Sequence, residues 1–231
     1  MNKTKIALLI TGGCFFSANL FASSVDFRHE YKHETKQQAS RIKMGTSFEN
    51  NFAVSLELKF KSADNTDFMK DLVNNGSELG LGYKWKINDE WALQPGMPIE
   101  FGQSSTTYKP QLRLIYKPAM IDGFSVSGRY RLDIKPTQTK PSVNNKYRDR
   151  YTVNFGYNIQ NVVLGLELNY YKAHSDTYVL YDNKNTNYEN NFTAGYKMGS
   201  WKPWIELGDV SVSSKSADRE LRSRVGLSYS F

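Results

Sequence analysis

The sequence predicts an all-β protein, a 12-stranded antiparallel transmembrane β-barrel. Twelve segments alternate apolar residues with small, polar or basic ones at a period of two, which is the periodicity of a strand with two different faces. Short turns and longer polar loops alternate between these segments, as they do in transmembrane barrels. The mean hydropathy is −0.58, and no apolar run reaches the ~18 residues that a membrane helix needs, which excludes a helical membrane protein.

The alternation is clear from the first segment onward. Val25, Phe27, His29 and Tyr31 share one face there, and charged residues occupy the other. The segment 52–61 sets five apolar residues against five that are small or charged. The twelve expected strands cover residues 25–32, 41–48, 52–61, 78–86, 91–101, 108–117, 124–133, 148–157, 162–171, 191–197, 203–208 and 219–231.

The fifth expected strand, 91–101, departs from the simple pattern because it contains Pro95 and Pro98. Proline has no N–H to donate to a neighbouring strand, so we expect a bulge or kink there. Turn-forming residues predict short connections near residues 50, 88, 120, 160 and 199, and longer polar loops near 35, 68, 104, 140, 180 and 214.

The final strand places Val225, Leu227, Tyr229 and Phe231 on one face. It is similar to the last strand of bacterial outer-membrane barrels, and we expect the barrel-assembly machinery to recognise it. A soluble β-sandwich or lipocalin-like barrel would also alternate, with its apolar face turned inward. The terminal aromatic residue, the aromatic residues at strand ends and the N-terminal segment favour the membrane version.

Residues 1–22 are predicted to be a secretory signal peptide, which leaves 23–231 as the channel domain. Lys3 and Lys5 precede a short apolar run, and small residues lead to a cleavage site after Ala22. Cys14 is the single cysteine, so the mature chain would contain no disulfide. Loss of the two lysines lowers the formal charge from +7 by two, to +5. A basic protein outside the cytoplasm suits anionic small ligands or an anionic membrane surface better than nucleic acid.

The second face of the strands carries the candidate binding residues. Twelve strands should leave a narrow pore, and basic side chains recur at the positions that face it. Some of these bases would pair with inward acids, but the excess of bases predicts a net positive lumen. The candidate pore-lining residues are Arg28, Arg41, Lys43, Lys59, Lys84, Lys109, Arg113, Lys117, Arg129, Arg131, Arg148, Arg150, Arg222 and Arg224.

Several of these bases are two residues apart, as in R-Y-R at 129–131 and R-D-R at 148–150. This spacing stacks two guanidinium groups along one strand wall. Guanidinium groups bind carboxylates through two hydrogen bonds, so a row of them suits a linear chain of carboxylates. Tyr171 and Trp204 are also expected to face inward, where they either offer flat surfaces to sugar rings or pack against the wall.

The mature chain resembles the oligogalacturonate-specific porin family (KdgM type) of Gram-negative outer membranes. The resemblance rests on S-V-D-F-R-H-E at 24–30, Q-P-G at 94–96, Y-K-P-Q-L-R at 108–113, G-R-Y-R at 128–131, W-K-P-W-I-E-L-G-D-V-S at 201–211 and R-S-R-V-G-L-S-Y-S-F at 222–231. It implies a monomeric barrel in the outer membrane, with a narrow channel lined by facing basic tracks. Such a channel passes acidic oligosaccharides, typically oligogalacturonates, into the periplasm; relatives admit sialic acid or other acidic sugars.

The alternatives from other classes are an outer-membrane barrel enzyme and an adhesive barrel. His29, His33 and His174 are the available histidines, and no G-x-S-x-G, H-E-x-x-H or Cys/His metal spacing is present. The sequence therefore predicts no catalytic residue, no metal and no cofactor. Besides the acidic oligosaccharide, the expected partners are outer-membrane lipid and lipopolysaccharide.

Overall fold

The computed structural model describes residues 20–63, 68–136 and 145–231. Most of the signal peptide predicted over residues 1–22 lies outside these ranges, and its last three residues begin the first strand. The strands of the described residues are β1 (Leu20–Lys32), β2 (Gln38–Phe48), β3 (Phe52–Ser62), β4 (Leu72–Tyr83), β5 (Trp85–Lys86), β6 (Trp91–Gly96), β7 (Ile99–Phe101), β8 (Thr106–Tyr108), β9 (Gln111–Tyr116), β10 (Phe124–Lys135), β11 (Lys146–Ile159), β12 (Val162–Ala173), β13 (Thr186–Tyr196), β14 (Trp201–Ser211) and β15 (Arg219–Ser230).

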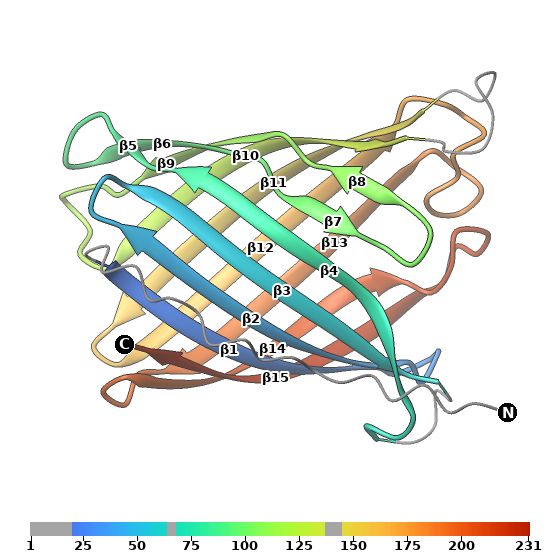
Figure 1. The fold of residues 1–231 in the computed structure, drawn as a ribbon, viewed down its shortest axis with the longest axis horizontal. Coiled ribbons are helices and arrows are strands. Elements are labelled where there is room, and N and C mark those ends of the chain that lie inside the picture. Colours follow the sequence, from blue (N-terminus) through green and yellow to red (C-terminus); the bar gives the residue numbers. More distant parts are fainter. Residues whose placement is uncertain (1–19, 64–67, 137–144) are drawn as a thin grey trace, which may run out of the picture.

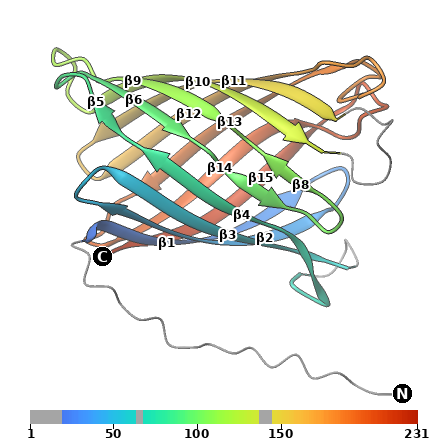
Figure 2. The same ribbon diagram turned by 45° about the horizontal axis from the view of Figure 1, so that its top comes forward.

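These strands form one closed antiparallel barrel (Figures 1 and 2). The barrel closes where β1 pairs with β15, in a register that sets Val25 opposite Tyr229. Three spans of the barrel are each divided into two strands, namely β4 with β5, β6 with β7, and β8 with β9. The described strands therefore make twelve spans, which confirms the predicted fold class.

The interruption predicted around Pro95 and Pro98 is present, and a second one lies beside it. β6 and β7 are separated by Met97 and Pro98, whereas Pro95 stays within β6. β8 and β9 are likewise separated by two residues, Lys109 and Pro110. Backbone hydrogen bonds bridge both breaks, because Lys109 N–H donates to the Pro98 carbonyl at 2.9 Å and Leu132 N–H donates to the Pro110 carbonyl at 3.0 Å. The missing proline donors are thus compensated locally.

Three strands begin five or more residues earlier than the sequence pattern indicated, and β1 is one of them, since it starts at Leu20 rather than at residue 25. β4 starts at Leu72, six residues before the expected strand, and β13 starts at Thr186, five residues before it. The added residues of β4 and β13 are mostly polar and show no alternation, so periodicity did not reveal them. Their backbones nevertheless pair with a neighbour: Asn74 lies opposite Phe60, beyond an irregularity in the register of β3 and β4. Backbone pairing alone extends these strands.

The two ends of the barrel differ. The short turns and the C-terminus lie at the left-hand end in Figure 1, and the predicted longer loops lie at the right-hand end. Two connections at that end are nevertheless brief, since residues 33–37 join β1 to β2 and residues 102–105 join β7 to β8. In outer-membrane barrels the short turns face the periplasm. The left-hand end is called the short-turn end below.

The outer surface of the barrel is apolar and edged with aromatic side chains. Tyr130, Tyr151, Tyr170 and Tyr188 lie directly opposite one another on β10 to β13 and form an exposed tyrosine row. Toward the short-turn end, the Trp91 ring stacks on another aromatic ring, Tyr116, with centroids 4.4 Å apart. In the described part of the chain no helix is long and apolar enough to span a membrane. The outward-facing side chains of the strands make up the apolar surface.

Candidate functional site: the barrel lumen

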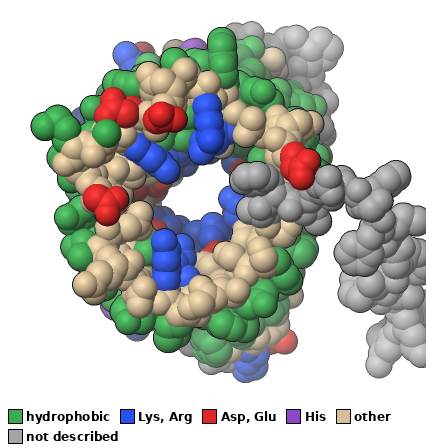
Figure 3. Space-filling view, turned by 90° about the vertical axis from the view of Figure 1, so that its left-hand side faces the viewer, with side chains coloured by type: hydrophobic (Ala, Val, Ile, Leu, Met, Phe, Trp, Pro, Cys, Tyr) green, Lys and Arg blue, Asp and Glu red, His purple; other side chains and the backbone are tan. Residues whose placement is uncertain are grey.

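The barrel encloses a water-accessible passage. Figure 3 looks into it from the short-turn end and shows lysine and arginine side chains around an open hole. A cavity of about 780 Å³ follows the inner wall, and its lining includes Lys43, Arg113, Lys117, Arg129 and Arg131. Because the side chains of a strand alternate between faces, the inward set is small or polar and the outward set is apolar.

Seven of the fourteen candidate residues belong to one side of the lumen, which we call the compensated wall. It runs along β13 to β15, β1 to β4, β7, β8 and the residue after β8, Lys109. Eight of its basic side chains meet eight carboxylates within 4.0 Å, and Lys202 on β14 also lines the lumen without a carboxylate at that distance among the described residues. The bases are Arg28, Lys32, Arg41, Lys43, Lys59, Lys109, Arg222 and Arg224; the acids are Asp26, Glu30, Glu57, Glu78, Glu100, Glu189, Glu206 and Glu220.

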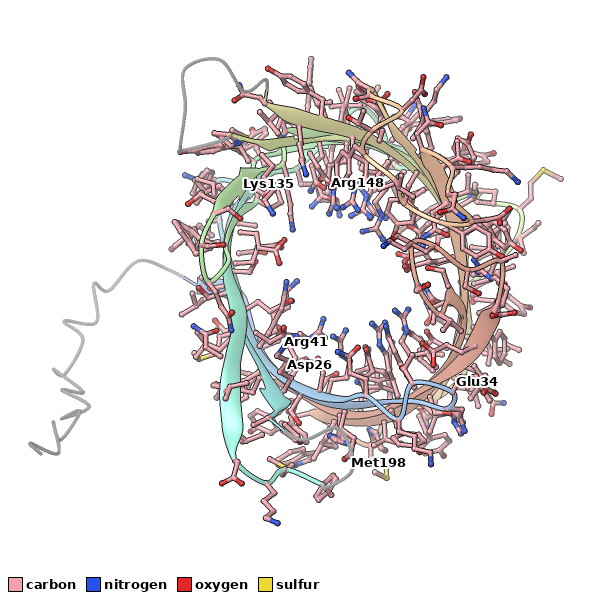
Figure 4. All side chains as sticks on the ribbon, turned by 90° about the vertical axis from the view of Figure 1, so that its right-hand side faces the viewer. Asp26, Glu34, Arg41, Lys135, Arg148 and Met198 are labelled. Carbon is pink, nitrogen blue, oxygen red and sulfur yellow. The ribbon has the colours of Figure 1, made fainter. Side chains whose placement is uncertain are left out.

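The tightest contacts of the compensated wall are made by residues directly opposite in register. Arg224 faces Glu30 on β1 and Glu206 on β14. Its guanidinium lies 2.6 Å from the first carboxylate and 2.5 Å from the second. Arg41 contacts Asp26 at 2.6 Å, and Figure 4 shows this pair on the inner wall. Paired charges of this kind satisfy one another, which leaves little attraction for a further anion.

The opposite side, which we call the arginine wall, is formed by β9 to β12. It contributes five arginines, and Figure 4 shows one of them, Arg148, across the passage from Arg41. Within 4.0 Å of these five, the described residues provide just two carboxylates, those of Asp133 and Glu167. The five are Arg113, Arg129, Arg131, Arg148 and Arg150. The positive excess of the lumen therefore concentrates on this wall.

Two members of the arginine wall have no carboxylate within ion-pair distance among the described residues. Arg113 and Arg129 lie directly opposite each other on β9 and β10. Arg113 Nη1 donates to the Ser127 hydroxyl at 2.9 Å, and Arg129 Nη2 donates to the Thr152 hydroxyl at 3.1 Å. Arg129 Nε is buried with no hydrogen-bond partner. Guanidinium groups held by neutral hydroxyls keep their full positive charge available to an anion in the passage.

The remaining arginines of this wall are held in place by specific partners. Asp133 lies between Arg131, at 2.7 Å, and Arg148, at 2.6 Å. Arg150 Nε and Nη2 both donate to the Asn169 side-chain oxygen, at 3.0 and 2.8 Å. The Tyr171 ring lies 5.1 Å from the guanidinium carbons of Arg148 and Arg150. These contacts fix the orientation of the two arginines on β11.

Tyr171 and Trp204 both face inward, and both pack against the wall. Tyr171 is 6% exposed, and its hydroxyl donates to Glu189 at 3.3 Å. The Trp204 indole N–H donates to Asp26 at 3.0 Å, and its ring lies over Gly226, which has no side chain to displace it. These contacts agree with the role of packing against the wall, rather than with that of offering flat surfaces to sugar rings.

The last two candidate residues, Lys84 and Lys117, lie toward the short-turn end. Lys84 occupies the break between β4 and β5, and Lys117 follows β9. Lys117 also lines the 780 Å³ cavity. Neither has a carboxylate within 4.0 Å among residues 20–63, 68–136 and 145–231. The neutral partners of the arginine wall, Thr152 and Asn169, had no distinguishing sequence signal beyond their inward position.

The histidines make no hydrogen bond or ion pair with the five arginines among the described residues, although His174 follows β12 and contacts a residue of β11. His174 contacts Asp149 at 2.9 Å, His33 contacts the Ser223 hydroxyl at 2.9 Å and His29 contacts the Ser40 hydroxyl at 3.1 Å. Across the part of the chain that the structure describes, no group of three or more His, Cys, Asp or Glu side chains is arranged to hold a metal ion.

The sequence of this chain matches a known protein family. The family described as "Oligogalacturonate-specific porin protein (KdgM)" matches residues 16–231. The oligogalacturonate-specific porin KdgM of Dickeya dadantii (strain 3937) is 34% identical over 98% of this chain and 100% of that protein. The N-acetylneuraminic acid outer membrane channel protein NanC of Escherichia coli (strain K12) is 26% identical over 58% of this chain and 56% of that protein.

A solved structure agrees with the sequence relatives. The structure of the KdgM porin in complex with disordered oligogalacturonate is 30% identical in sequence and has a TM-score of 0.68. The match covers 90% of this chain and 99% of that one. The fold, the outer-membrane location and the non-enzymatic character expected from the sequence are thereby confirmed. The chain therefore belongs to the KdgM family of oligogalacturonate-specific porins, and it is a β-barrel channel of the outer membrane.

Proposed function

We propose that this porin is anion-selective and passes acidic oligosaccharides, above all oligogalacturonates, into the periplasm along its arginine wall. The observation that carries the proposal is the pair Arg113 and Arg129, two adjacent guanidinium groups that face the lumen without a carboxylate partner among the described residues. A chain of uronate residues supplies the carboxylates that these groups lack. The identity to a porin whose printed name is oligogalacturonate-specific supports the same sugar.

We propose an order of importance for the fourteen candidate residues in substrate binding, based on their contacts. We assign direct contact with the sugar carboxylates to the five members of the arginine wall, with Lys117 and Lys84 acting near the short-turn end. The seven candidates of the compensated wall are occupied by acids, so they would shape the passage and set its width. A carboxylate could then move from one guanidinium to the next without leaving the positive side of the lumen.

A second candidate substrate is a shorter acidic sugar such as sialic acid. The observation in its favour is the relationship to a channel protein named for N-acetylneuraminic acid. A sugar with a single carboxylate would engage one guanidinium at a time, whereas an oligogalacturonate would engage several. The number of carboxylates that bind at once therefore separates the two candidates.

The test is ion selectivity and current block of the purified mature protein in a planar lipid bilayer. Trigalacturonate, N-acetylneuraminate and a neutral trisaccharide of similar size would each be added in turn. We expect anion selectivity, strong block by trigalacturonate, weak block by N-acetylneuraminate and none by the neutral sugar. Equal block by the neutral sugar would contradict the proposal, and stronger block by N-acetylneuraminate would favour the second candidate.

We also propose how the chain reaches the outer membrane and in what form it acts there. We infer that residues 1–22 are removed on export, that the barrel acts as a monomer, and that the assembly machinery recognises β15. The apolar outer surface with its tyrosine row suits lipid and lipopolysaccharide.

A further inference from the structure

Glu167 is a lumen-facing acid on the arginine wall that the proposed mechanism does not use. It lies on β12, and its side chain is 31% exposed, compared with 5% for Asp133, the other carboxylate of this wall. Asp133 contacts two arginines at 2.6 and 2.7 Å. Glu167 contacts Arg150 Nη2 at 3.5 Å, so its ion pair is loose.

Neutral amides hold Glu167 instead. Its Oε1 accepts hydrogen bonds from Asn169 Nδ2 at 2.9 Å and Asn191 Nδ2 at 3.3 Å. In the amide orientation that satisfies both of its neighbours, Asn154 donates to Glu167 Oε2 at 3.1 Å and accepts from Arg113 Nη1 at 3.2 Å. Three asparagines therefore hold a negative charge in the arginine wall. Glu167 lies beside Arg150 and is linked to Arg113 through Asn154.

This arrangement differs from an ion pair built for stability. An acid that served to neutralise the arginines would approach them as closely as Asp133 does. Here the strongest contacts of Arg150 go to Asn169, at 2.8 and 3.0 Å, and its contact with Glu167 is the longest of the set. Arg150 Nη1, for which the described residues provide no hydrogen-bond partner, can consequently donate to an incoming carboxylate while Glu167 stays where its asparagines hold it.

We propose that Glu167 is a resident counterion that competes with the carboxylates of the passing sugar and so sets how quickly the sugar is released. The inference rests on the proposed function. A channel must bind its cargo weakly enough to let it leave, and five arginines facing a polyanion would hold it too long. The fixed negative charge of Glu167 repels each carboxylate that settles on Arg113 or Arg150, which shortens its stay.

The test compares the dwell time of trigalacturonate in single-channel recordings of the wild-type protein, Glu167→Gln, Glu167→Asp and Glu57→Gln. The Glu167→Gln variant keeps an oxygen for the asparagines and removes the charge, so we expect a dwell time about tenfold longer. The Glu167→Asp variant keeps the charge and should stay near the wild type. Glu57 lies on the compensated wall against Arg41 and Lys59, so Glu57→Gln is a control that removes the same charge from the opposite side.

The outcomes separate this inference from the proposed function. Equal lengthening in Glu167→Gln and Glu57→Gln would show a general effect of net charge and overturn the inference, as would an unchanged dwell time in Glu167→Gln. If trigalacturonate does not block the wild-type channel, the proposed substrate is wrong. In that case the reversal potential in a potassium chloride gradient tests the counterion role of Glu167 without the sugar. The role requires Glu167→Gln to gain more anion selectivity than Glu57→Gln.

Discussion

Replacement of Arg129 by glutamine should weaken the block by trigalacturonate without unfolding the barrel. Arg129 is partly buried on the arginine wall, its one hydrogen bond to a side chain goes to Thr152, and no described carboxylate loses a partner when it is removed. A hydrogen bond to a charged group contributes about 1.5–3 kcal/mol, and every ~1.4 kcal/mol is tenfold in affinity. Because the lumen contains water, we expect the lower end of that range, an affinity about tenfold weaker.

The matched control is Arg224→Gln, which removes the same charge from the compensated wall. Arg224 lies 2.6 Å from Glu30 and 2.5 Å from Glu206. Its loss would leave two largely buried carboxylates without their closest base, at a cost of roughly 3 kcal/mol, the low end for a broken buried pair. The block by trigalacturonate should change about twofold at most, because salt screens the added negative charge across the lumen.

The assays are concentration-dependent current block in a planar bilayer and the midpoint of thermal unfolding followed by far-ultraviolet circular dichroism. We expect Arg129→Gln to lose affinity and keep its midpoint, and Arg224→Gln to keep affinity and unfold at a lower temperature. If both variants lose affinity equally, the division of the lumen into two walls has no functional meaning and the total charge alone governs binding.

Further predictions concern the short-turn end, the inner packing, the outer surface and the solution conditions. The double replacement of Lys84 and Lys117 by glutamine should reduce anion selectivity, measured as a smaller reversal potential in a salt gradient. In Gly226→Ala the new methyl group would overlap the Trp204 ring, so the unfolding midpoint should fall by the equivalent of about 1–3 kcal/mol and the tryptophan fluorescence should shift. Tyr151→Ala removes the central ring of three, with neighbours at 5.4 and 6.5 Å, and should destabilise the barrel in lipid by about 1 kcal/mol, seen in the same unfolding assay. Raising the salt concentration should weaken block of the wild-type channel by trigalacturonate, because the charges that make the contacts face a lumen that contains water and dissolved ions; an unchanged block would argue against charge contacts.

The fold class could be predicted from the sequence, because a barrel strand alternates apolar and polar residues and this alternation is visible in the sequence. Val25 to Tyr31 and the segment 52–61 could be assigned to faces directly, and the apolar face in lipid follows from that assignment. The early starts of β4 and β13 could not be predicted, since polar residues pair through their backbones without any periodic signal. Pro110 was likewise not expected to divide a strand.

The candidate site was predictable as a set of inward bases but not as two unlike walls. R-S-R at 222–224 and R-Y-R at 129–131 have the same spacing. Their environments differ because Arg224 lies opposite Glu30 and Glu206, whereas Arg129 lies opposite Arg113 and Thr152. Which residues face one another depends on strand register, and a shift of one residue would reverse every face. The sequence alone does not specify that register.

The unequal walls have a consequence for the path of the sugar. A nearly balanced row of charges on one side and a row with a larger positive excess on the other create an electric field directed across the passage, at right angles to the direction of transport. A polyanion in such a field is drawn off the axis and against β9 to β12, with one edge toward the protein and the other toward water. Only the edge that faces β9 to β12 then contacts the arginines. An acidic chain whose substituents are confined to the opposite edge should therefore pass as readily as an unmodified one.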